Sequence, residues 1–104
     1  MNSREILPRV PAFSTLMGGA FNQDWEDEWS SAEEVFASIL SGYPEFRRQL
    51  LSDLRLIDDS CSGDEIDDLL LNLGSGFSPD IDAGMEAKAW VRSLSARVAA
   101  SLDG

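Results

Sequence analysis

Carboxylates are the residues of this sequence most able to do chemistry, and they gather in short runs. The runs are Asp24 with Glu26-Asp27-Glu28, Asp64-Glu65-Asp67-Asp68, and Asp80-Asp82. Paired carboxylates can hydrolyse glycosidic bonds and clustered oxygens can bind calcium, but no pair here has a spacing fixed by a recognisable motif. The runs at 24–28 and 80–82 also lack the alternating acids and the length of a calcium-binding EF-hand loop. We therefore expect solvated acids, with no metal and no cofactor.

Nucleophilic catalysis finds little support in the remaining residues. The sequence has no histidine and a single cysteine, Cys61, so it lacks the usual serine and cysteine arrangements and the common zinc sites. Its glycine-rich segment GSGFSP, residues 74–79, lacks the lysine of a phosphate-binding loop. We expect no enzymatic activity, and a hydrolase built on a carboxylate pair is the enzymatic alternative.

The charge of the sequence is strongly negative and unevenly distributed. Nineteen acids and eight bases give a formal net charge of −11. Sixteen of the acids lie in two windows without a base, residues 10–46 and 56–87. If these windows are neighbours in the fold, they create one negative face, which disfavours nucleic acid and membranes as partners and favours a basic protein. Acids that serve only solubility are the alternative.

Hydrophobic spacing predicts an all-α fold, a single-domain bundle of about five short helices spanning residues 1–104. The first helix begins near Pro11 and stops at Gly18-Gly19, and the last covers residues 87–102. Between them we expect a helix capped by Ser30 or Ser31, a helix from Pro44 to Ile57, and a helix from Ser62 to Gly74 whose Glu65 completes a capping box.

Two segments are expected outside these helices. Residues 1–10 precede Pro11 and contain Pro8, which favours an extended N-terminal arm laid over the domain. Residues 75–85 are rich in turn formers, but their apolar residues Phe77 and Ile81 are expected to dock on the bundle.

Two features of the sequence bear on the cellular compartment of the protein. A lone cysteine cannot form an internal disulfide, which suits a reducing compartment. The sequence also shows no apolar stretch of the length of a signal peptide or a membrane span. We expect a cytoplasmic protein.

The segment GGAFNQDWEDEW, residues 18–29, allows two interpretations. Trp25 and Trp29 framed by carboxylates have the composition of an interface anchor with a charged rim, yet their spacing of four also suits two residues packed on one side of a core. Asp24 and Asn22 are expected to accept backbone N–H bonds at the adjoining helix start or turn.

Four stretches of the chain together resemble a known family. They are VPAFSTLMGGAFNQDWEDEWSSAEEVFASIL, YPEFRRQLLSDLRLI, LLLNLGSGFSPDID and AWVRSLSARV. The chain resembles the immunity proteins of bacterial contact-dependent growth inhibition systems over roughly residues 10–102. The most specific part is Gly19–Trp25, where the family pattern has an aromatic, His-Gln-Asp and often a second aromatic. Asn22 stands here in place of the histidine.

The resemblance implies a small helical protein that binds the C-terminal toxin domain of a large exoprotein and prevents self-intoxication. Such toxins are commonly basic nucleases, which agrees with the negative charge of this sequence. We expect a 1:1 complex with the cognate toxin domain, an RNase more than a DNase, in which the active site is occluded. The alternative is an acidic helical adaptor or regulatory subunit of another basic protein.

The resemblance also separates structural residues from recognition residues. A motif shared by proteins that neutralise different toxins is assigned to the fold, and replacing Asp24 is expected to harm folding more than replacing Asp27. The structural motif comprises Gly18, Gly19, Phe21, Asn22, Gln23 and Asp24. The candidate toxin-binding residues are Trp25, Glu26, Asp27, Glu28, Asp64, Asp67, Asp68, Asp80 and Asp82.

Overall fold

The computed structural model describes residues 1–103, which form helices and loops without a strand. This confirms the predicted all-α fold. The helices are α1 (Ser3–Ile6), α2 (Pro11–Thr15), α3 (Trp25–Glu28), α4 (Ala32–Leu40), α5 (Pro44–Ser60), α6 (Gly63–Asn72), α7 (Pro79–Asp82) and α8 (Ala87–Asp103). A 3₁₀ turn, Leu7–Arg9, follows α1, and a π-helical turn, Leu16–Ala20, extends α2.

Five of these helices were predicted, and three were not. The predicted ones are α2, α4, α5, α6 and α8. The missed helices α1, α3 and α7 have four residues each, which is too short to produce a periodic apolar pattern.

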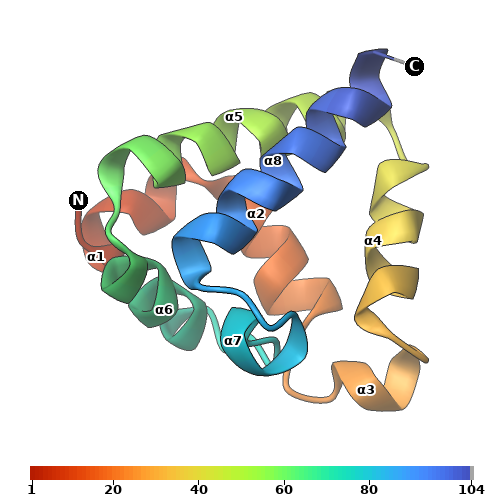
Figure 1. Cartoon of the computed structure of the whole chain (residues 1–104), viewed down its shortest axis with the longest axis horizontal. Helices are drawn as coiled ribbons and strands as arrows, with labels where there is room; N and C mark the ends of the chain where they lie inside the picture. The colour runs from red at the N-terminus through yellow and green to blue at the C-terminus, as the bar shows by residue number, and fades with distance from the viewer. Residues whose placement is uncertain (104) are drawn as a thin grey trace.

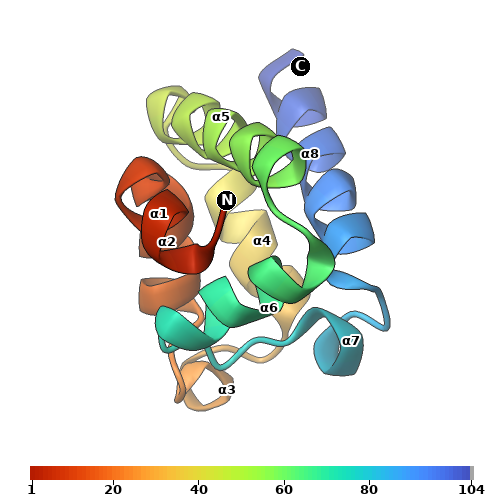
Figure 2. The same ribbon diagram turned by 90° about the vertical axis from the view of Figure 1, so that its left-hand side faces the viewer.

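Helix α5 lies along the upper end of the molecule in Figure 1, and α8 runs from the middle of the molecule to the same end. Helices α5 and α8 pack against each other, and α2 packs against α5. Helices α3, α6 and α7 lie at the lower end in Figure 1, and they keep that place in the view turned by 90° (Figure 2). The three helices that carry the candidate acids therefore share one end of the bundle.

The core is built from one apolar stripe on each long helix. Leu50, Leu54 and Ile57 of α5 are fully buried, at offsets of four and three residues that place them on one helix face. Burying each such side chain contributes roughly 1.5 to 3 kcal/mol. An aromatic cluster extends this core toward the lower end: the ring centroid of Phe77 lies 4.9 Å from that of Phe21 and 5.3 Å from that of Trp90.

Side-chain caps set several helix starts as the sequence predicts. Ser31 accepts a hydrogen bond from the N–H of Glu34 and starts α4. Ser62 and Glu65 form a complete capping box at α6, with each side chain bonded to the other residue's N–H.

One cap comes from a distant helix. The buried carboxylate of Asp53, in α5, accepts the N–H groups of Ala12 at 2.8 Å and Phe13 at 3.1 Å, in the first turn of α2. Burial raises the pKa of Asp53, and the two backbone donors oppose that rise. This residue ties α2 to α5.

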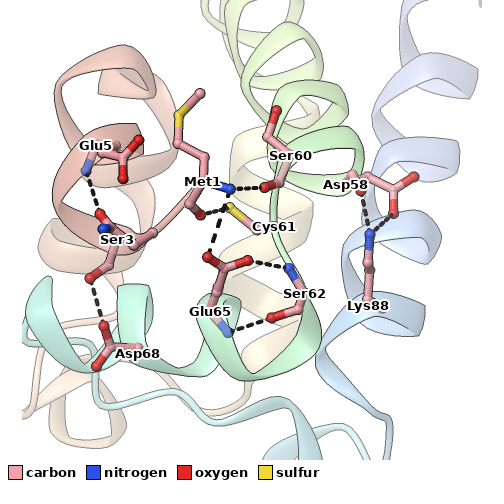
Figure 3. Close-up of polar contacts among 11 residues, drawn as sticks. Met1, Ser3, Glu5, Asp58, Ser60, Cys61, Ser62, Glu65, Asp68 and Lys88 are labelled. Atoms are coloured by element: carbon pink, nitrogen blue, oxygen red, sulfur yellow. Dashed lines mark hydrogen bonds and ion pairs between the residues drawn. The ribbon is translucent and has the colours of Figure 1, made fainter.

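The prediction of an extended arm at residues 1–10 is wrong. Asn2 caps α1 by accepting the N–H of Glu5, and Ile6 and Val10 are fully buried. The Ser3 hydroxyl donates to the Asp68 carboxylate at 2.6 Å and fastens α1 to α6 (Figure 3). Pro8 lies in the 3₁₀ turn, where its missing N–H is harmless.

The prediction for residues 75–85 is right for Phe77 and wrong for Ile81. Phe77 is buried in the aromatic cluster, whereas Ile81 is 81% exposed. Pro79 is the buried residue of α7, and Ile81, two positions later in the helix, points to nearly the opposite side.

Candidate functional site

Helices α3, α6 and α7 form a negatively charged surface that we call the acidic end. They carry three, four and two acids respectively and no base. The eight candidate acids among them are all exposed: Glu26, Asp27, Glu28, Asp64, Asp67, Asp68, Asp80 and Asp82. In residues 1–103, none of these eight forms an ion pair with a lysine or arginine.

The bases that do form ion pairs lie on α8. Lys88 and Arg92 pair with Asp58 of α5, at 3.5 and 3.0 Å, and Arg97 pairs with Glu33 of α4. Glu65 of α6 pairs with the N-terminal ammonium group of Met1 at 3.7 Å, whereas the eight candidate acids of the acidic end have no ion-pair partner in the described part of the chain.

Two of the three acidic runs meet in space. Asp67 of α6 and Asp80 of α7 both line two adjoining hollows, of about 270 Å³ and about 470 Å³. Partial burial, followed by the negative charges of Asp80 and Asp64, raises the pKa of Asp67. A cation placed between these carboxylates would relieve their mutual repulsion.

Sequence reasoning missed Glu86, which lines the larger hollow. Its signal was present, because Glu86 belongs to the base-free window at 56–87.

Some acids of this end also hold local structure (Figure 3). Asp68 accepts the Ser3 hydroxyl, and Glu65 closes the capping box of α6. Asp82 accepts the N–H of Ser78 at 2.8 Å, and the Ser78 hydroxyl donates to Asp80 and lowers its pKa. Asp64 and Asp67 are the acids of α6 left without such partners among the described residues.

The third run, on α3, has a different setting. Glu26, Asp27 and Glu28 are exposed, but Trp25 is only 5% exposed and packs against Phe21, with ring centroids 5.3 Å apart. The interpretation of Trp25 as an exposed interface anchor is therefore corrected: its side chain belongs to the core. Trp29 is half-buried and packs against the same core.

The turn before α3 is built by Asn22. Its amide nitrogen donates to the carbonyl of Gly19 at 3.0 Å, and its amide oxygen accepts the N–H of Asp24 at 2.8 Å. The side chain of Asp24 itself is exposed and makes no capping bond, so its predicted capping role is wrong. The expectation that Asp24 matters more for folding than Asp27 loses its basis. Gln23 is also exposed, while Phe21 is fully buried.

Two glycines let this turn lie against residues 73–77. A Cβ on Gly18 would come within 3.0 Å of the Leu73 carbonyl oxygen, and a Cβ on Gly76 within 2.6 Å of the Asn22 oxygen. The N–H of Gly76 donates to the Phe21 carbonyl at 2.7 Å. Gly19 has open space around it. The backbone contact at Gly76 therefore holds the segments leading to α3 and α7 side by side.

Metal binding and membrane insertion find no support in the described residues. Within 1–103, no group of three or more cysteine, aspartate and glutamate side chains is arranged to hold a metal ion. None of the helices described has both the length and the apolar character needed to cross a membrane.

Comparison with known proteins identifies a family. A family model described as the CdiI immunity protein matches residues 9–98, a span that starts just before α2 and ends within α8. No curated protein and no solved structure matched the chain. The matched span contains the Gly18–Trp25 turn and all eight candidate acids. The resemblance read from the sequence is confirmed, and the chain belongs to the CdiI immunity protein family.

Proposed function

We propose that this chain neutralises a basic nuclease toxin, an RNase more than a DNase, by covering its active site with the acidic end in a 1:1 complex. The observation that carries the proposal is the set of eight exposed acids on α3, α6 and α7 that lack basic partners in residues 1–103. Family membership supports a toxin as the partner.

The charge of the acidic end suits the surface that a nuclease uses. An enzyme that grips a phosphate backbone needs clustered lysine and arginine, and exposed carboxylates can occupy the same positions as phosphates. Opposite fields also speed the encounter: charge steering raises association rate constants from roughly 10⁵–10⁶ to as much as about 10⁸–10⁹ M⁻¹s⁻¹ at low salt. An immunity protein benefits from this speed because the toxin must be captured before it acts.

Inhibition of this kind requires no reaction in the inhibitor. Carboxylates that lie over the toxin's cationic cleft exclude the nucleic acid by occupying its place and by repelling its phosphates. The unpaired charge of the eight candidate acids is therefore an advantage for binding, although repulsion among them costs stability.

The test is toxin activity at defined stoichiometry. The purified cognate toxin domain is incubated with RNA, and separately with DNA, while the chain is added in steps. We expect RNA cleavage to fall linearly and end at one equivalent. Activity that persists in a saturated complex would contradict occlusion, and cleavage of DNA alone would contradict the assignment of an RNase.

A further inference from the structure

A groove runs between α6 and α7, and its two parts differ in some of the residues that line them. It consists of the two hollows that share the walls Asp67 and Asp80. The smaller hollow is also lined by the apolar residues Leu70, Leu71, Phe77 and Pro79 and by the hydroxyl-bearing residues Ser75 and Ser78. The larger one adds the acids Asp64 and Glu86. Both hollows therefore have acidic walls, and the smaller one adds the exposed apolar side chain of Leu71.

Lys88 is the one base among the described residues that lines this groove. Its ammonium group donates to the backbone carbonyl of Asp58 and lies 3.5 Å from the Asp58 carboxylate (Figure 3). Lys88 is therefore engaged by α5, and the acids of the groove keep their negative field.

Exposed apolar side chains lie on both helices that form the groove. Leu71 of α6 is 76% exposed and Ile81 of α7 is 81% exposed. In residues 1–103 the third large apolar side chain left exposed is Tyr43, which directly precedes α5 and lines neither hollow. Leu71 lines the smaller hollow, whereas Ile81 lines neither hollow. Exposed apolar side chains that gather in a patch mark interaction sites.

Leu71 and the acids of α6 share one helix face. Asp64, Asp67 and Leu71 are separated by three and four residues, the spacing of neighbours on a helix surface. A partner segment lying along this face would meet two carboxylates first and then an apolar side chain.

We propose that the α6–α7 groove is the docking site of the toxin, and that it receives a toxin segment carrying lysine or arginine at one end and an apolar side chain at the other. The cations lie among Asp64, Asp67 and Asp80, and the apolar side chain packs on Leu71. This inference rests on the proposed function and specifies which part of the acidic end makes the close contact.

The α3 helix has a lesser role in this arrangement. Its three acids are exposed, but its one large apolar side chain, Trp25, is buried. The α3 helix therefore steers the partner without anchoring it. A second copy of the chain is a poor occupant of the groove because acids would face acids.

Truncation of exposed apolar side chains tests the anchor. Binding kinetics with the purified toxin domain are measured for the wild type, L71A and I81A, with Y43A as the control. We expect L71A to raise the dissociation rate constant roughly ten-fold or more with little change in the association rate constant, as for a buried anchor. We expect a smaller rise for I81A and no change for Y43A.

Neutralised acids test the position of the cations. D67N is compared with E28Q, since both residues are exposed and free of ion pairs in the described part of the chain. We expect D67N to raise the dissociation rate constant several-fold and E28Q to change mainly the association rate constant. Thermal unfolding of every variant checks that the fold is intact.

Failure of this inference differs from failure of the proposed function. If the wild type binds and inhibits the toxin while L71A and D67N dissociate like the wild type, the groove is not the docking site and the proposed function stands. If the wild type does not bind the toxin, both fail. Self-association of the free chain that L71A abolishes would also overturn the groove assignment, by identifying a second copy as its occupant.

Discussion

Asp53 offers the most direct test of how α2, and the turn that follows it, is held in place. Its carboxylate, buried in α5, accepts the N–H groups of Ala12 and Phe13 at 2.8 and 3.1 Å. In D53A both donors lose their partner. A buried donor left without a partner costs about 1 to 3 kcal/mol, but part of that loss is offset because the carboxylate no longer has to be desolvated. We expect D53A to lose about 2 to 4 kcal/mol of unfolding free energy.

Two control variants separate hydrogen bonding from charge. D53N keeps an oxygen that can accept both N–H groups, so we expect a loss below about 1 kcal/mol. D59A removes an exposed acid from the same helix, and we expect a change within about 0.5 kcal/mol.

The assay is thermal and urea unfolding followed by circular dichroism. For a domain of this size, about 1 kcal/mol corresponds to roughly 4 to 8 °C in Tm, so D53A should melt about 8 to 32 °C lower than the wild type. A D53A protein as stable as the wild type would refute the reasoning, as would a D53N protein damaged as much as D53A.

The pH dependence of the same residue has a definite sign. Burial raises the pKa of Asp53 in the folded chain, so the folded state holds this proton more tightly than the unfolded state does. The contribution of Asp53 to stability therefore decreases as the pH rises from the ordinary aspartate value through the raised pKa, and it is constant above that pKa. D53N should lack this component in a plot of unfolding free energy against pH.

Three further predictions concern the acidic end. G76A should lose about 1 to 3 kcal/mol because its Cβ would lie 2.6 Å from the backbone oxygen of Asn22, whereas G19A, which has open space around it, should unfold like the wild type. Urea unfolding measures the unfolding free energy of both variants, and an equal loss in G76A and G19A would contradict the close-contact argument. Toxin affinity should decrease as the pH falls through the raised pKa of Asp67, because the complex favours the charged carboxylate and must release the proton. Calorimetry should show this loss for the wild type and less of it for D67N, and identical pH profiles would contradict the role of Asp67. S62A should lose about 1 kcal/mol through the broken capping box, measured by thermal unfolding, and an unchanged Tm would show that the cap is dispensable.

The helices predicted from the sequence are those with an apolar stripe, and in most cases a start signal, in their own residues. Ser62 and Glu65, three residues apart, predict the start of α6, and Pro44 predicts the first turn of α5. Helices α1, α3 and α7 were not predicted, because a helix of a single turn is stabilised mainly by the residues it packs against and not by its own sequence. The burial of Ile6 in α1 illustrates this dependence.

The missed features of the site depend on contacts between distant residues. Asp53 lies among the apolar residues of α5, and no local pattern reveals that residues 12 and 13 supply its hydrogen bonds. Asp67 and Asp80 likewise come close together only because α7 folds back onto α6. Leu71 could have been noticed, because it falls off the apolar stripe formed by Ile66, Leu69, Leu70 and Leu73.

The central claim is that the acidic end meets a basic toxin surface, and the ionic-strength dependence of association tests it most directly. Association rate constants with the toxin domain are measured from low to high salt for the wild type and for the triple variant D64N/D67N/D80N. We expect the wild-type rate constant to fall by about ten-fold or more, and that of the triple variant to start lower and fall less. A wild-type rate constant that does not change with salt would contradict the account.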